Sequence, residues 1–178
     1  MLTWEIAKVK QLCLYILCGL PFAGKSSLAR ALAKAVSAAY VELDAINSER
    51  GLGLDGKRIS AADWDETYRI AYQRIDGFLR EGRSVVYDSA SFTRAQRDVV
   101  RAIAERYGTP SKVVCVEAPE NTVRARLVQN RKTRLRYDVR DDDFAHVLDN
   151  FQPPEDDEHV VCYDQTVPIG EWIKRNFA

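Results

Sequence analysis

Short apolar runs alternate along the chain with longer stretches in which apolar residues recur every three or four positions. The apolar runs cover residues 12–18, 39–43, 84–88, 112–117 and 158–163. Runs of this length predict buried strands, and the spacing between them predicts amphipathic helices. The repeated order of strand and helix predicts βαβ units in a parallel sheet covered on both faces. The sequence therefore predicts one α/β domain.

Local signals mark several helix ends. Thr93 and Gln96 form a capping box, and Pro119 stands at a first helical position. Other helices are predicted near Leu28, from Asp63, around Phe144 and from Ile169. Residues 1–10 fit either an edge strand or a short helix and show no catalytic group. We treat them as an N-terminal extension of a domain that spans residues 11–178.

A phosphate-binding motif lies between the first apolar run and the first helix. The segment from Gly19 to Ser26 has the pattern G-x-x-x-x-G-K-S, the Walker A loop. Its glycines let backbone N–H groups wrap a phosphate chain, Lys25 reaches the β- and γ-phosphates, and the Ser26 hydroxyl serves Mg²⁺. A chance glycine turn is the alternative, but the flanking strand and helix favour phosphate binding. The predicted nucleotide-binding residues of the loop are Gly19, Pro21, Phe22, Ala23, Gly24, Lys25, Ser26 and Ser27.

Two aspartates follow predicted strands, at the sheet edge where ligands bind in open α/β folds. Asp88 ends the third strand, where a Walker B carboxylate would hold Mg²⁺ beside the phosphates. Asp44 follows the second strand and is well placed at the same edge. A helix-capping or turn aspartate is the alternative for Asp44.

Residues 130–143 form a strongly charged tract. Its five cations are Arg131, Lys132, Arg134, Arg136 and Arg140, and three aspartates follow them. A solvated surface run is one interpretation. The other is a flexible flap whose arginines fold over a triphosphate and neutralise charge on the transferring group. We favour the flap and treat residues 130–143 as a lid.

The overall charge restricts the range of partners. The chain has 178 residues, with 26 basic and 26 acidic side chains and a formal net charge of +0. No global field therefore draws it to nucleic acid or to an anionic membrane, and any polyanion site must be local. No segment is long enough to span a bilayer, so we expect no membrane partner.

The cysteines and histidines lack the spacing of metal ligands. The four cysteines are Cys13, Cys18, Cys115 and Cys162. They form no C-x-x-C pair, so we interpret them as small buried hydrophobes rather than as ligands or a disulfide framework. That interpretation suits a reducing cytoplasm. His146 and His159 each stand alone, which favours structural or surface roles.

Taken together, these motifs resemble those of a known family. The Walker A loop, residues 43–46, residues 85–94 and residues 151–158 are similar to P-loop kinases known mainly as predicted kinases. Relatives of that group include polynucleotide 5′-kinases, zeta-toxin-type kinases and chloramphenicol phosphotransferase. The resemblance covers nearly the whole chain from Gln11 onward. It implies a five-stranded parallel sheet in the order 2-3-1-4-5, with ATP and Mg²⁺ as the phosphate donor.

The resemblance also implies roles for individual residues. Asp44 would be the acceptor-site carboxylate, which orients and deprotonates the attacking hydroxyl. Arg131 and Arg134 are the nearest candidates for the lid arginines, Arg131 as a catalytic residue and Arg134 as a nucleotide-binding residue. Relatives tend to place two lid arginines four residues apart, whereas Arg126 and Arg131 stand five apart. Either Arg126 or Arg131 is therefore expected at the adenine edge or at the γ-phosphate.

Three function classes fit a Walker A loop: a kinase acting on a small hydroxyl-bearing molecule, a polynucleotide 5′-kinase, and a nucleotide-dependent switch. The switch is weakest, because residues 88–91 are Asp-Ser-Ala-Ser where GTPases carry D-x-x-G, and N-K-x-D is missing. The neutral net charge argues against an extended nucleic-acid footprint. We therefore expect a cytoplasmic ATP-dependent kinase with a small-molecule acceptor. A nucleic-acid 5′ end is the alternative acceptor.

Overall fold

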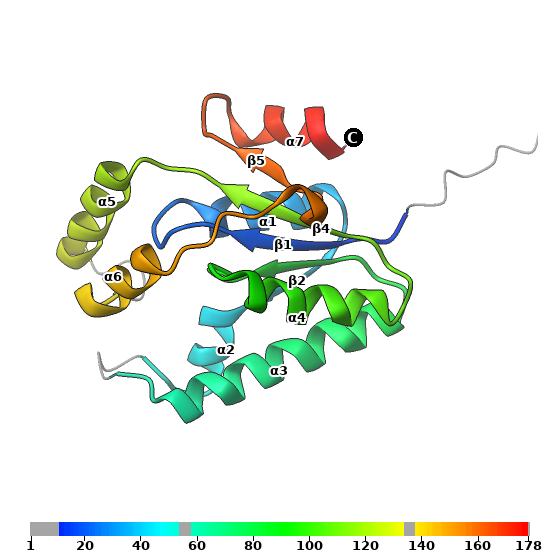
Figure 1. The fold of residues 1–178 in the computed structure, drawn as a ribbon, viewed down its shortest axis with the longest axis horizontal. Coiled ribbons are helices and arrows are strands. Elements are labelled where there is room, and N and C mark those ends of the chain that lie inside the picture. Colours follow the sequence, from blue (N-terminus) through cyan, green and yellow to red (C-terminus); the bar gives the residue numbers. More distant parts are fainter. Residues whose placement is uncertain (1–10, 54–57, 134–137, 178) are drawn as a thin grey trace, which may run out of the picture.

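A five-stranded parallel sheet lies at the centre of the molecule (Figure 1). The computed structural model describes residues 11–53, 58–133 and 138–177. The strands are β1 (Leu14–Cys18), β2 (Ala39–Glu42), β3 (Val85–Asp88), β4 (Ser111–Val116) and β5 (Val161–Tyr163). They lie in the order β2-β3-β1-β4-β5, and all four pairings are parallel. The predicted class and strand order are therefore confirmed. The expected N-terminal extension, residues 1–10, lies outside the described residues.

Helices cover both faces of the sheet. They are α1 (Lys25–Ala35), α2 (Leu43–Glu49), α3 (Ala61–Arg80), α4 (Arg94–Glu105), α5 (Glu120–Thr133), α6 (Asp141–Asp149), the short 3₁₀ helix η1 (Asp156–Glu158) and α7 (Ile169–Phe177). Helices α1 and α7 pack together on one face, and α3 and α4 pack together on the other (Figure 1). Helices α5 and α6 lie beyond the carboxyl ends of the strands (Figure 1). Among the described helices, none is both long and apolar enough to cross a membrane.

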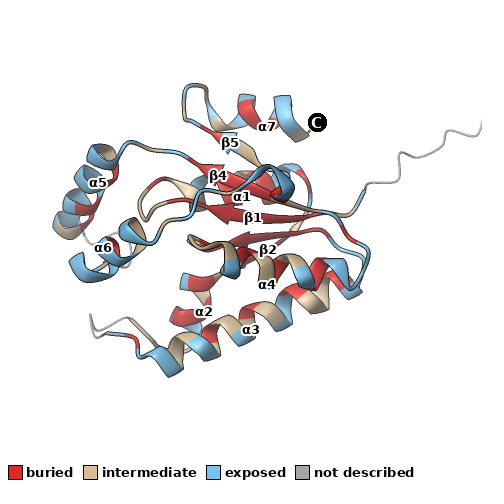
Figure 2. Ribbon diagram, in the orientation of Figure 1, coloured by how far each residue is buried: buried red, intermediate tan, exposed pale blue. Residues whose placement is uncertain are grey.

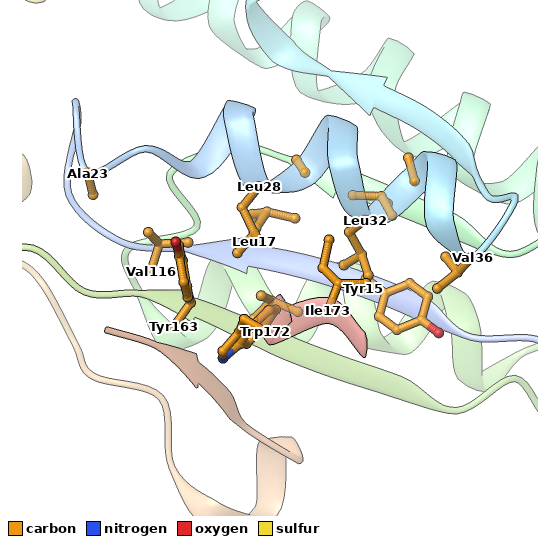
Figure 3. Close-up of a cluster of buried hydrophobic side chains, with 14 of the residues drawn as sticks. Tyr15, Leu17, Ala23, Leu28, Leu32, Val36, Val116, Tyr163, Trp172 and Ile173 are labelled. Atoms are coloured by element: carbon orange, nitrogen blue, oxygen red, sulfur yellow. The ribbon is translucent and has the colours of Figure 1, made fainter. Parts of the chain in front are cut away.

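The central strand β1 is apolar throughout, as expected for a strand that helices cover on both faces. All five residues of β1 are buried, and Figure 2 shows the sheet buried between its helical layers. Side chains alternate between the two faces. Leu17 packs with Leu28 and Trp172 on the side of α1 and α7 (Figure 3), whereas Ile16 belongs to the cluster around Ile75 on the opposite side. The two cores together hold the carboxyl end of β1 in place.

Two element boundaries differ from the prediction. The second strand ends at Glu42, where the extended backbone turns directly into α2. Asp44 therefore lies in the first turn of a helix that the hydrophobic pattern did not predict, a position that suits an acidic side chain. The fifth strand begins at Val161, not at Glu158. The side chain of Glu158 accepts a hydrogen bond from the backbone N–H of Glu155 at 2.8 Å, which closes the turn η1.

The predicted capping box is confirmed, whereas two other helix starts differ slightly from the prediction. The N–H of Gln96 donates to Thr93 Oγ1 at 3.3 Å and the N–H of Thr93 donates to Gln96 Oε1 at 3.2 Å, forming the predicted capping box. Helix α5 begins directly after Pro119. Helix α6 begins at Asp141, earlier than Phe144, because aspartates fill its first turn and favour the positive end of the helix dipole.

The cysteine prediction needs one correction. Cys13, Cys18 and Cys115 are buried, but Cys162 is exposed. Cys162 lies on β5, which is an edge strand of the sheet and is only three residues long. Helices therefore do not cover its side chain completely. Both histidines, His146 and His159, are exposed. Their expected surface character is therefore confirmed.

Candidate active site

The Walker A loop joins the end of β1 to the start of α1. Gly19 and Gly24 have positive φ angles of 140° and 107°. A Cβ atom at Gly19 would lie 2.5 Å from the carbonyl oxygen of Val116, so only glycine fits there. Helix α1 begins at Lys25 without a side-chain hydrogen bond at its N-cap residue. The first N–H groups of α1 and the helix dipole therefore form a site suited to phosphate.

The Lys25 side chain folds over this loop. Its ammonium donates to the carbonyl oxygens of Gly19 at 2.9 Å and Leu20 at 2.8 Å. Burial lowers the pKa of Lys25, and the nearby carboxylates of Asp88 and Asp44 oppose that shift without cancelling it. The structure thus brings the predicted lysine and both predicted aspartates within electrostatic reach of one another.

Asp88 ends β3 and is 4% exposed. One of its carboxylate oxygens accepts a hydrogen bond from the hydroxyl of Tyr40 at 2.6 Å. Tyr40 lies on the neighbouring strand β2, and burial together with the Asp88 charge raises the pKa of its phenol. The tyrosine therefore stays a hydrogen-bond donor and fixes the orientation of the carboxylate. Ser26, the other predicted Mg²⁺ ligand, lies in the first turn of α1.

Asp44 is exposed and lies in the first turn of α2. The N-cap residue of this helix is Glu42, so Asp44 is not its cap. The charge of Asp44 raises the pKa of both Lys25 and Tyr68, although burial has the larger effect on each. Asp44 therefore lies within electrostatic reach of both Lys25 and Tyr68.

Arg126 of α5 contacts the other side of the Walker A loop. Its guanidinium donates to the carbonyl oxygens of Phe22 at 3.0 Å and Ala23 at 3.1 Å. It also donates to the side-chain oxygen of Gln165 at 3.1 Å. Gln165 in turn donates to the Ala23 oxygen at 3.1 Å and to the Glu117 carbonyl oxygen at 2.5 Å. These contacts bind α5 and the segment after β5 to the loop.

An open pocket of about 380 Å³ lies beside these contacts. Its lining includes Phe22, Gly24, Ser27, Arg126, Asn130, Tyr163 and Gln165. The volume is in the range of sites for small organic ligands. Because the pocket adjoins the glycine end of the Walker A loop, a nucleotide with its phosphates on the loop would place its base or ribose there.

The predicted lid arginines lie elsewhere. Arg131 donates to the carboxylates of Asp138 at 3.2 Å and Asp141 at 2.8 Å, and to the carbonyl oxygen of Val139 at 3.0 Å. It thus joins the end of α5 to the start of α6 and does not contact the Walker A loop in this structure. Arg134 lies outside the described residues.

A buried ion pair joins two segments that are far apart in the chain. Arg97 and Glu158 are both 0% exposed, and two hydrogen bonds of 2.6 and 3.0 Å join them. The remaining guanidinium nitrogen of Arg97 donates to the carbonyl oxygens of Ser91 at 3.1 Å and Gln152 at 3.0 Å. The pair therefore connects the segment after β3 to the segment before β5, just under the carboxyl end of the sheet.

Sequence reasoning missed Tyr40, Arg97 and Gln165. None of them belongs to a local motif, because the partner of each is far away in the chain. The separations are 48 residues for the Tyr40–Asp88 hydrogen bond, 61 for the Arg97–Glu158 pair and 142 for the Gln165–Ala23 hydrogen bond. The only available signal was that residues 151–158, which include Glu158, stood among the segments that resemble P-loop kinases.

The chain matches the model of a known protein family. The model of the family described as "AAA domain" matches residues 14–154. Among curated proteins, none matches the chain.

Solved structures show the same fold at low sequence identity. A sugar kinase from a Janibacter species is 18% identical, with a TM-score of 0.67 over 93% of this chain and 91% of that one. Kti12 from Chaetomium thermophilum, solved with ADP-AlF3, is 18% identical, with a TM-score of 0.69 over 90% and 94%. The APS kinase of Mycobacterium tuberculosis, solved with AMPPNP and APS, is 17% identical, with a TM-score of 0.66 over 93% and 95%. From its match over residues 14–154 and its strand order, the chain belongs to the AAA domain family and has the fold of the P-loop kinases.

Proposed function

We propose that the protein is an ATP-dependent kinase that transfers the γ-phosphate to a hydroxyl group of a small molecule. The observation that carries the proposal is the arrangement around Lys25. Two carboxylates, Asp88 and Asp44, act on it electrostatically, and a pocket of about 380 Å³ adjoins the loop on the Arg126 side. This arrangement supports a donor site in the pocket and an acceptor site near Asp44.

The donor side would hold ATP. The base and ribose would occupy the pocket beside Arg126 and Gln165, and the phosphates would bind the N–H groups of the Walker A loop. Lys25 would exchange its carbonyl partners for β- and γ-phosphate oxygens, which favour the ammonium form. The lysine would then neutralise charge on the transferring group.

Ser26 and Asp88 would hold Mg²⁺. The donor set fits, because Mg²⁺ prefers hard oxygen ligands and Asp88 offers a buried carboxylate that is already oriented by Tyr40. When bound, the ion supplies positive charge to the phosphate oxygens.

The acceptor would bind on the Asp44 side. The Asp44 carboxylate would accept the proton of the attacking hydroxyl as the hydroxyl attacks the γ-phosphate. Arg131 and Arg134 would approach the γ-phosphate from the lid. For Arg131 this requires exchange of its present partners, Asp138 and Asp141.

The names of similar proteins support this class of reaction. They include a sugar kinase and an APS kinase, both of which take small acceptors. The four free cysteines support a reducing, cytoplasmic setting, which we include in the proposal.

An acceptor screen tests the proposal. The purified chain, Mg²⁺ and γ-labelled ATP are incubated with separate pools of sugars, nucleosides, hydroxyl-bearing antibiotics and 5′-hydroxyl oligonucleotides. We expect label in a small-molecule pool. Label in the oligonucleotide pool alone would show that the acceptor is a nucleic-acid 5′ end and not a small molecule. If ATP binds but no pool is labelled, the kinase assignment is contradicted.

A further inference from the structure

Three cysteines form a row across one face of the sheet. Cys18 of β1 is the register partner of Cys115 of β4, and Cys115 is the register partner of Cys162 of β5. Partner residues of parallel strands present their side chains to the same face. This row could not be predicted from the sequence, because the three residues are far apart in the chain and only the strand register brings them together.

A carboxylate completes the cluster at the outer end of the row. The sulfur atoms of Cys115 and Cys162 and a carboxylate oxygen of Glu117 all lie within 4.8 Å of one another. Glu117 stands two residues after Cys115, so it falls on the same side of the strand. Two sulfurs and one carboxylate oxygen therefore point at a common centre.

Strand spacing separates the outer pair of cysteines from Cys18. Cys18 and Cys162 stand two strands apart, roughly 9.6 Å at the usual strand spacing. One zinc ion joins sulfurs no more than about 4.6 Å apart, twice the usual Zn–S distance. One ion that binds Cys162 therefore cannot also bind Cys18. Cys18 instead contacts Cys115 from the β1 side, and its sulfur accepts a hydrogen bond from Arg97 at 3.8 Å.

We propose that Cys115, Cys162 and Glu117 bind a thiophilic divalent cation of the zinc class, with the fourth coordination position open to solvent. Thiolates and a carboxylate are common ligands for such ions. Cys162 and Glu117 are exposed, which gives the ion an entry path, and Cys115 is buried, which gives one rigid ligand. Each thiol loses its proton to solvent when its sulfur binds the ion.

The site is distinct from the Mg²⁺ site proposed at Ser26 and Asp88, which offers only oxygen ligands. It would fasten the three-residue edge strand β5 onto β4. It also adjoins the nucleotide pocket, because the backbone oxygen of Glu117 already accepts a hydrogen bond from Gln165.

The test is a titration of the full chain, reduced beforehand and checked for four free thiols. Co²⁺ or Cd²⁺ is added in the presence of excess Mg²⁺, which occupies oxygen-only sites. Sulfur-to-metal charge-transfer absorption then reports thiolate binding directly. We expect saturation at one equivalent per chain.

Single substitutions assign the ligands. Cys162→Ser should abolish most of the absorption and weaken binding at least tenfold, and Glu117→Gln should weaken binding while the absorption band persists. Both residues are exposed, so both variants should fold. Cys13→Ser is the matched control, since Cys13 faces the other core cluster, and it should bind like the unsubstituted chain. An unchanged band in Cys162→Ser, or no band with the reduced chain, would overturn the proposal.

Discussion

Asp44 is the residue whose role in the chemistry is most open to a direct test. Asp44 is exposed and lies in the first turn of α2, and its negative charge raises the pKa of Lys25. Asp44→Asn keeps the shape of the side chain and removes the base. We expect turnover to fall by about 10² or more, while ATP affinity and the melting temperature hold.

The control for this variant is Glu49→Gln, which removes another exposed carboxylate from the same helix. It should leave turnover within about twofold, because Glu49 pairs with Arg74 away from the loop. If Asp44→Asn retains turnover but melts at a lower temperature, Asp44 stabilises helix α2 and does not deprotonate the acceptor.

Asp88 and Tyr40 should determine the response to Mg²⁺. Asp88→Asn removes one negative charge from the proposed metal ligands, so we expect the Mg²⁺ concentration for half-maximal activity to rise about tenfold or more. Tyr40→Phe removes only the 2.6 Å hydrogen bond that orients Asp88, and a rise of a few-fold is expected. Tyr72→Phe, a tyrosine on α3, is the control. Identical Mg²⁺ curves for all variants would place Asp88 outside the metal site.

Among the elements, the segments before β5 and after β3 depend on the Arg97–Glu158 pair. Arg97→Met would leave Glu158 buried and without its cation, so we expect the free energy of unfolding to fall by about 3–5 kcal/mol. Urea denaturation measures this change. Arg106→Met, which breaks the exposed Arg106–Asp76 pair near the end of the same helix, should cost less than about 1 kcal/mol.

The same pair predicts a pH dependence. Burial raises the pKa of Glu158, but the hydrogen bonds from Arg97 and from the Glu155 N–H outweigh it, so the folded pKa lies below 4.5. A lowered carboxyl pKa stabilises the fold fully above the unfolded value, and this stabilisation is lost as the pH falls through the folded value. The gap between Arg97→Met and the unsubstituted chain should therefore shrink in acid. A gap that grows below pH 4.5 would contradict the ion pair.

Helices α5 and α6 include the two ends of the predicted lid, residues 130–143. Arg131 joins them through Asp138 and Asp141, and the guanidinium of Arg124 lies 5.0 Å from the centre of the Phe144 ring. If lid arginines turn toward the γ-phosphate, residues 130–143 should gain hydrogen-exchange protection with a non-hydrolysable ATP analogue. Helix α7 should change little and serves as an internal control. Equal protection of residues 130–143 with and without the analogue would favour the alternative interpretation, a solvated charged surface.

At the scale of the whole molecule, the sequence predicted what depends on local pattern. The apolar runs and the G-x-x-x-x-G-K-S loop were sufficient to predict the strands, most helices and the place of the loop between β1 and α1. Contacts between distant residues were not predictable in this way. No local motif marks Arg97, and only the fold shows that it pairs with Glu158.

The site was predicted unevenly for the same reason. Asp88 was identified by its place at the end of an apolar run, whereas its partner Tyr40 depends on the pairing of β2 with β3. The sequence also could not choose between Arg126 and Arg131. In the structure Arg126 contacts the Walker A loop, and Arg131 is held by lid aspartates.

The central claim is that the Walker A loop carries out phosphoryl transfer, and the most direct measurement is transfer of label from γ-labelled ATP by a Lys25→Ala variant. Lys34→Ala, an exposed lysine in the last turn of the same helix, is the matched control. We expect Lys25→Ala to lose transfer to every acceptor and to bind ATP more weakly, because the lysine neutralises charge on the β- and γ-phosphates. Lys34→Ala should retain full transfer. Near-normal turnover by Lys25→Ala on any acceptor would show that the loop is not catalytic and would contradict the account.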